Sequence, residues 1–274
     1  MYGYGYSLYN RTQFLGSGGG IDPSAQAFIT AAVITDPTQI TAINNLVVGM
    51  KADGIWTKMK AIYPFVGGTA STHKYNLKDP RDLDAAFRLV FNGGWTHSSN
   101  GATPNGTNGY ADTKLNAIGN LTNNNMHISY YVRNYTLSVS GKVLIGSVDV
   151  TASTAVVLNW SSTAPFFYPT IQEYTFPAIS TFPSVLKGLH IGRRINSTQE
   201  ALFINATKYE TTQASNNLIP NNTFYLGSNH TLVAQQYTDA QTAFSSIGDG
   251  LTDTEASNLY TRVQAYQTAL SRQV

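Results

Sequence analysis

The stretch that decides the fold is residues 63–110, YPFVGGTASTHKYNLKDPRDLDAAFRLVFNGGWTHSSNGATPNGTNGY. It combines dense loop signals, rich in Gly, Asn and Ser, with a cluster of charged residues in a chain that has few. Before it the sequence predicts helices, and after it the sequence predicts β-strands. We therefore interpret it as the junction between a helical N-terminal part and a β-domain, with the Gly93-Gly94-Trp95 region forming the first strand and loop of that domain.

Two helix starts with the same chemistry precede this junction. Asp22-Pro23 and Asp36-Pro37 each place a capping carboxylate before a proline at the first helical position. The second helix has one apolar stripe at spacings of three and four, and Gly54 is a typical C-terminal cap. We expect the apolar face to continue in a short helical piece, so that residues 21–62 form a helical segment that packs on the following domain.

Downstream, the sequence predicts short strands separated by turn residues. Residues 126–132 alternate, with Met126, Ile128, Tyr130 and Val132 on one side. Five further segments have the composition of strands: 143–150, 155–160, 189–194, 201–207 and 223–227. Residues 252–255 form a capping box ahead of an apolar stripe, which predicts a C-terminal helix. The predicted fold is mainly β, a jelly-roll β-sandwich over residues 63–274 with short N-terminal helices and a C-terminal helix.

The composition excludes several classes of protein. The chain has no cysteine, and charged residues make up 12% of it, against about 25% in an average protein. The formal net charge of +2 is too small to argue for a nucleic-acid partner. No apolar run approaches the length of a membrane span. The first residues, MYGYGYSLYN, have neither a basic start nor an apolar core, so we expect no secretory signal.

The first 20 residues are predicted to form a flexible arm. Tyr2, Tyr4, Tyr6 and Tyr9 are spaced by small residues, and Gly16–Gly20 follows as a hinge. Such an arm can anchor the chain in a partner, although a disordered terminus is the alternative. One anchoring arm per chain favours a homo-oligomer with symmetric docking.

Candidate catalytic and metal-binding patterns are weak. Glycosidases need two carboxylates across a sugar ring, and the nearest acidic cluster is Asp79, Asp82 and Asp84. We interpret these acids as the first turn of a helix that begins at Asp79-Pro80, with calcium binding as the alternative. The five histidines are scattered, without the spacing of metal ligands, and there is no Gly-x-Ser-x-Gly elbow. The sequence therefore predicts a protein that is not an enzyme and has no cofactor.

A binding surface is better supported. On the predicted strand 126–132, the face opposite the apolar one carries His127 and Tyr131, while Trp160 and His190 lie on other strands. Aromatic rings beside hydrogen-bonding groups suit sugar recognition, because a pyranose has an apolar face and a rim of hydroxyls. The alternative is that these aromatic residues fill the core, as they commonly do in strands.

Three segments carry a family resemblance: AIYPFVGGTASTHKYNLKDPRDLDAAFRLVFNGGWTHSSNG, PNGTNGYADTKL and IGDGLTDTEASNLYTRVQAYQTALSRQV. They resemble bacteriophage virion proteins of tails, fibres or spikes that carry a concanavalin A-like, laminin-G-like jelly-roll domain. Residues 202–207, 225–227 and 251–255 occupy the places of three of that fold's strand and helix signatures, with Ala206 where the family has glycine.

The resemblance implies a virion protein that is assembled in the host cytoplasm and displayed on the particle surface. The arm would bind other virion proteins, and the lectin-like sandwich would attach to a host-surface glycan. A purely structural capsid or tail component without a ligand is the alternative, and a glycan-degrading jelly-roll enzyme is a third reading.

Overall fold

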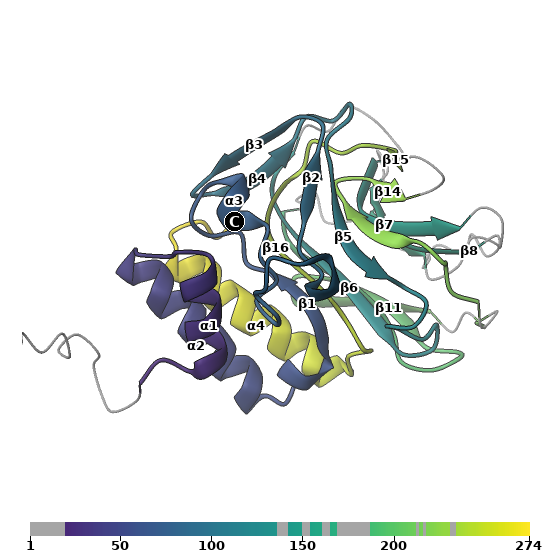
Figure 1. Ribbon diagram of the computed structural model, residues 1–274. Helices are drawn as coiled ribbons and strands as arrows, with labels where there is room; N and C mark the ends of the chain where they lie inside the picture. Colours follow the sequence, from purple (N-terminus) through teal and green to yellow (C-terminus); the bar gives the residue numbers. More distant parts are fainter. Residues whose placement is uncertain are drawn as a thin grey trace, which may run out of the picture.

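The computed structural model describes residues 20–135, 142–149, 154–160, 165–168, 187–211, 214–215, 218–230 and 234–274. The predicted arm, with Tyr2, Tyr4, Tyr6 and Tyr9, lies outside the described residues. Two β-sheets face each other, and helices cover the outer side of one of them (Figure 1). We call the sheet under the helices the helix-side sheet and the other one the far sheet. The predicted β-sandwich with flanking helices is confirmed.

The helix-side sheet has the strand order β12-β11-β10-β6-β16-β4-β3, and β1 also pairs with β16. Its neighbouring strands are all antiparallel. Its strands are β1 (Met59–Tyr63), β3 (Trp95–Ser98), β4 (Gly101–Pro104), β6 (Met126–Asn134), β10 (Gly188–Arg194), β11 (Glu200–Ile204), β12 (Thr207–Thr211) and β16 (Gln241–Gly248).

The far sheet has the order β15-β14-β7-β13-β5-β2, with β8 on β7 and β9 on β8. Its pairs are antiparallel except for β14 with β7, which is parallel. Its strands are β2 (Val90–Asn92), β5 (Tyr110–Asn116), β7 (Lys142–Asp149), β8 (Thr154–Trp160), β9 (Pro165–Tyr168), β13 (Thr223–Leu226), β14 (Asn229–His230) and β15 (Ala234–Gln235).

The helices begin where their caps predict. The Asp22 carboxylate accepts from the Ser24 amide ahead of α1 (Pro23–Ala31), and the Asp36 carboxylate accepts from the Gln39 amide ahead of α2 (Pro37–Ala52). Thr252 and Glu255 form the predicted capping box of α4 (Asp253–Ala269). The shorter helical pieces are α3 (Ala70–His73) and the 3₁₀ turns η1 (Trp56–Lys58) and η2 (Asp84–Ala86). No helix among the described residues is long and apolar enough to cross a bilayer.

Two large hydrophobic cores lie on either side of the helix-side sheet. One fills the space between the sheets and includes Ile128, Tyr130 and Leu226. The other joins α1, α2 and α4 to the outer face of the helix-side sheet, through residues such as Phe244. Because this sheet is covered on both faces, every residue of its strands β10 and β11 is buried.

Three details of the prediction are wrong. Residues 59–63 form β1 rather than a helical piece, because their backbone pairs with β16; the predicted boundary at residue 62 therefore falls inside a strand. Asp79-Pro80 does not begin a helix, since Asp79 bridges to Asn76 and the next helical turn is η2. The first strand is β1, and the Gly93-Gly94 pair instead lies between β2 and β3.

Candidate functional site

The four residues predicted to bind sugar do not come together. His127 and Tyr131 lie on the face of β6 that the helical layer covers, and both are fully buried. His190 is also buried and pairs across strands with Tyr130 of the inter-sheet core. Trp160 ends β8 in the other sheet. The expectation that His127, Tyr131 and His190 are exposed is wrong. The helices cover the face that carries His127 and Tyr131, whereas His190 points toward the far sheet with Tyr130.

His127 instead belongs to a sealed polar network. Its Nδ1–H donates to the backbone oxygen of Asp249 at 2.7 Å, and its Nε2 lies 3.0 Å from the hydroxyl of Ser246. The Ser129 hydroxyl lies 2.7 Å from that of Ser246. Burial lowers the pKa of His127 to about 4, which keeps the ring neutral. A serine next to a histidine is the pairing of a nucleophile with its base, but all three side chains are fully buried, so a substrate cannot reach them.

The acidic cluster is held in ion pairs. Asp79 pairs with Arg81, Asp82 with Lys74 and Arg88, and Asp84 with Arg88. Hydrogen bonds from Arg81 hold the pKa of Asp79 below its usual value, and hydrogen bonds from Lys74 and Arg88 do the same for Asp82. In the described part of the chain, no three His, Asp or Glu side chains are arranged to hold a metal ion.

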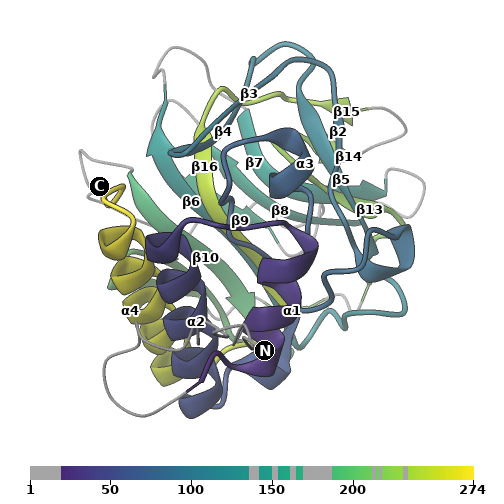
Figure 2. The same ribbon diagram turned by 60° about the vertical axis from the view of Figure 1, so that its left-hand side comes forward.

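The outer face of the far sheet carries a pair of stacked tyrosines. Ala111 of β5 and Leu226 of β13 point into the inter-sheet core, so Tyr110 and Tyr225 point away from it. Their rings are stacked at 4.5 Å between centroids with an interplanar angle of 25°. Helices α1, α2 and α4 lie on the opposite side of the molecule and do not cover this face (Figures 1 and 2).

A β-bulge places a charged pair beside the tyrosines. Asp112 lies directly opposite Tyr225, and the pairing of β5 with β13 shifts register immediately after it. Lys114 adopts a left-handed conformation, with φ of 59°, and its backbone N–H donates to Asp112 at 2.8 Å. Its ammonium returns to the same carboxylate at 2.9 Å, and this hydrogen bond raises the pKa of Lys114. Burial first, and then the Asp112 charge, raise the pKa of Tyr225 to about 12.

A second aromatic group closes the edge of the sandwich beside this face. Phe91 of β2 makes edge contacts with Trp95 and His97 of β3, at 5.2 and 4.6 Å between ring centroids. Gly227, with φ of 82°, follows β13, and a Cβ atom there would come within 3.3 Å of the Trp95 ring. Trp95 therefore reaches the end of the strand that carries Tyr225. We call Tyr110, Asp112, Lys114 and Tyr225 the tyrosine site, with Trp95 at its border.

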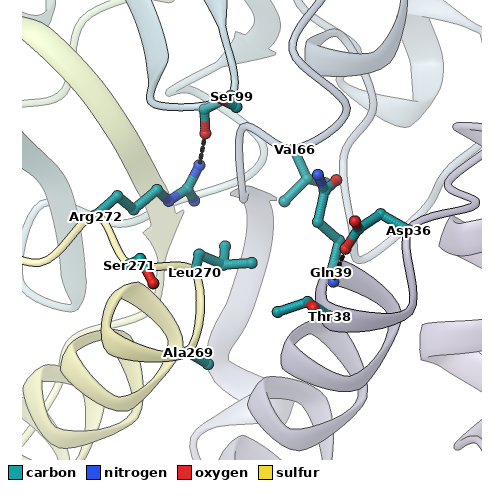
Figure 3. Close-up of a pocket in the computed structure, with 9 residues that line it drawn as sticks. All are labelled: Asp36, Thr38, Gln39, Val66, Ser99, Ala269, Leu270, Ser271 and Arg272. Atoms are coloured by element: carbon teal, nitrogen blue, oxygen red, sulfur yellow. Dashed lines mark hydrogen bonds between the residues drawn. The ribbon is translucent and has the colours of Figure 1, made fainter.

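A pocket of about 190 Å³ lies elsewhere, between the start of α2 and the end of α4 (Figure 3). Arg272 and Asp36 lie on opposite sides of it, and no aromatic ring lines it. The guanidinium of Arg272 donates to backbone oxygens of Pro64, Phe65, Ser99 and Ala243 and to the Gln267 side chain. These bonds tie the end of the chain to the sandwich, so the pocket is a poor candidate for a sugar site.

The sequence contains the signal for the tyrosine site. In residues 223–227, Phe224 and Leu226 alternate with Tyr225, just as Ala111 alternates with Tyr110 and Asp112. That pattern predicts aromatic and acidic groups on one face. The sequence does not show which strand faces remain uncovered by helices, and alternation alone favours His127 and Tyr131 of β6 equally well.

No protein-family model and no curated protein matches this chain. Solved structures match it in fold. Domain 4 of AbnA, a GH43 extracellular arabinanase from Geobacillus stearothermophilus solved in complex with arabinotriose, matches with a TM-score of 0.51 and 11% identity over 74% of this chain and 98% of that one.

Two larger proteins also contain the fold. A structure of botulinum neurotoxin type C, a toxin described as dependent on interaction with two ganglioside molecules for cell entry, has a TM-score of 0.51 and 11% identity over 78% of this chain. A mutant Trypanosoma rangeli sialidase with trans-sialidase activity has a TM-score of 0.50 and 10% identity over 84% of this chain. The match spans 53% of the toxin chain and 39% of the sialidase chain. The chain thus shares a β-sandwich fold with these proteins.

Proposed function

We propose that this protein is a non-catalytic glycan-binding module of a bacteriophage virion surface protein, a spike, fibre or surface module that attaches the particle to its host. The tyrosine site is the observation on which the glycan-binding part of this proposal rests. Two stacked rings lie beside a carboxylate and an ammonium, on a sheet face that the helices leave uncovered.

The chemistry of the tyrosine site suits a sugar. Aromatic rings offer an apolar surface to the C–H face of a pyranose, and the phenol groups add a polar end. The Asp112 carboxylate accepts hydrogen bonds from sugar hydroxyls, while the Lys114 ammonium donates to them. Ligand sites typically combine such an apolar surface with a few well-placed polar groups. A site of this size binds one sugar weakly, and several copies in a homo-oligomer would gain affinity through avidity.

The comparisons support the same class of ligand. One matching domain was solved with arabinotriose, and another matching protein is described as dependent on gangliosides. Both descriptions belong to those proteins, and the identities of 11% carry over the fold rather than the site. They support a proposal that rests on this chain's own residues.

The virion part of the proposal rests on the sequence resemblance. In this proposal the protein is assembled in the host cytoplasm and displayed on the particle surface. The segment with Tyr2, Tyr4, Tyr6 and Tyr9 would anchor the chain in other virion proteins, and the β-sandwich would face outward. Particles that keep residues 1–58 but lack the sandwich, which begins with β1, should assemble and fail to adsorb. Loss of assembly would instead favour a structural shell component.

Glycan binding is tested with Tyr110→Ala and Tyr225→Ala variants of the purified chain on an immobilised glycan panel. Each variant should lose about tenfold or more in affinity, because removing one aromatic contact costs roughly 1–2 kcal/mol. The matched control is Tyr209→Ala, which removes a half-buried tyrosine from β12 of the other sheet and should leave binding unchanged. Equal losses in all three variants, or no binding by the wild type, would contradict the proposed site.

A further inference from the structure

We infer that the Asp112–Lys114 pair is the polar clamp of the tyrosine site and that it selects uncharged glycans over sialylated or uronic-acid glycans. This inference rests on the proposed function and names its ligand class. It follows from three features of the described residues: the strained bulge in β5, the donors and acceptors that the pair leaves available, and the pairing of the nearby cations.

The first feature is the strain in β5. A non-glycine residue in the left-handed region costs on the order of 1–3 kcal/mol, and such outliers cluster at functional sites. Lys114 adopts that conformation with φ of 59°, where glycine would be less strained. The conformation brings both its backbone N–H and its ammonium to the Asp112 carboxylate. The strained bulge thus holds the lysine and the aspartate together beside Tyr225.

The second feature is the hydrogen-bonding capacity of the pair. The Lys114 ammonium has three N–H donors, of which Asp112 takes one, and the carboxylate can accept several hydrogen bonds in all. The Lys114 side chain is 29% exposed and that of Asp112 is 13% exposed, so a ligand reaches the ammonium directly and the carboxylate at its exposed edge. A donor next to an acceptor matches two neighbouring hydroxyls of a sugar ring. Charge-assisted hydrogen bonds of this kind are roughly twice as strong as neutral ones.

The third feature is the charge balance around the site. Lys114 pairs with Asp112, and Arg88, whose charge acts on Lys114, pairs with Asp82 and Asp84. An acidic sugar needs a cation for its carboxylate, and here it would have to compete with a carboxylate that is already in place. The fixed negative charge of Asp112 would also repel it. An uncharged sugar bonds to both members of the pair without separating them.

The test uses a panel of matched neoglycoconjugates. Lactose is compared with 3′-sialyllactose, and the uncharged probes arabinotriose and dextran are compared with the acidic probe hyaluronate. The wild-type chain should bind uncharged members at least tenfold more tightly than acidic ones. This affinity should change little between about 50 and 500 mM NaCl, because salt, with a Debye length of about 10 Å at 0.1 M, weakens only binding that depends on charge. Lys114→Met should weaken binding of the uncharged members about tenfold, the effect of losing one charge-assisted hydrogen bond.

Two further variants separate binding from folding and test the repulsion. Lys114→Gly relieves the left-handed strain, so it should lose sugar affinity like Lys114→Met while keeping or raising its resistance to urea. Asp112→Asn leaves the Lys114 ammonium unpaired and should raise binding of 3′-sialyllactose severalfold. Tighter wild-type binding of acidic members, or unchanged binding in Lys114→Met, would overturn the inference. If Tyr110→Ala still lowers the affinity for the bound glycan about tenfold, the proposed function stands although the inference fails. If the wild-type chain binds none of the probes, the inference and the proposed function are both overturned.

Discussion

Strand β6 of the helix-side sheet and strand β5 of the far sheet each direct one face into the inter-sheet core. They differ in what covers the opposite, outward face. On β6 that face carries His127, Ser129 and Tyr131, all fully buried under the helical layer. On β5 it carries Tyr110 and Lys114, which remain partly exposed. Similar residue types therefore form a sealed interior in one sheet and a partly accessible surface in the other, where Asp112 and Tyr225 are each 9% exposed. The three helices make the difference.

The covered face must satisfy its polar groups internally, because an unpaired buried donor or acceptor costs about 1–3 kcal/mol. His127 and the serines do so through each other and through the oxygen of Asp249, and Tyr131 donates to Gln264 of α4. On the face without helices, Tyr110 and Lys114 are partly exposed, so a ligand can reach them. Polar and aromatic side chains thus contribute to stability in the first sheet and to recognition in the second.

The largest expected effect contrasts the two faces directly. Phe244 is fully buried in the core between the helices and the helix-side sheet. Phe244→Ala should lower the free energy of unfolding by about 3–5 kcal/mol, the usual cost of deleting a buried phenylalanine. Tyr110→Ala, on the uncovered face, should cost much less. Urea unfolding of both variants measures this, and similar losses would show that the two faces are equally packed.

The next effect is acid destabilisation from the covered face. Burial lowers the pKa of His127 to about 4, whereas the unfolded chain titrates near 6.5. The unfolded state therefore binds the proton more readily, so stability is highest above pH 6.5 and falls as the pH drops toward 4. The expected loss from His127 is about 2 kcal/mol at pH 5. Burial also lowers the pKa of His73, to about 3, which acts in the same direction.

Urea unfolding at pH 7 and pH 5 measures this loss, and His127→Gln should reduce the difference between the two. The imidazole can also be followed by NMR in the folded protein. If its titration midpoint lies near 6.5, the neutral, sealed network is wrong.

The sequence predicts the elements of this fold better than their surroundings. Asp22, Asp36 and Thr252 define helix starts through local chemistry within three residues, and the structure confirms all three. Alternation also predicts β6 and the inner position of Ile128. The outcome for His127 depends on Ser246 and Asp249, more than a hundred residues away, and no local pattern contains those contacts.

The errors around Asp79 have the same origin. An aspartate before a proline is a good local cap, but here Asp79 pairs with Arg81, and the neighbouring acids pair with Lys74 and Arg88. The tyrosine site could not be predicted from the sequence either. Its residues have the composition of any strand, and only the arrangement of the layers shows that helices leave their face uncovered.

The smallest expected effect weakens the cover itself. The Thr252 hydroxyl accepts from the Glu255 amide at the start of α4, the helix that helps to seal the helix-side sheet. Thr252→Ala should lower the free energy of unfolding by about 1 kcal/mol. Thr261→Ala is the matched control, since Thr261 is exposed within the same helix and alanine is the better helix former there. If α4 only covers the opposite sheet, Thr252→Ala should leave binding at the tyrosine site unchanged, whereas a parallel loss of glycan affinity would show that the two faces are coupled through the core between them.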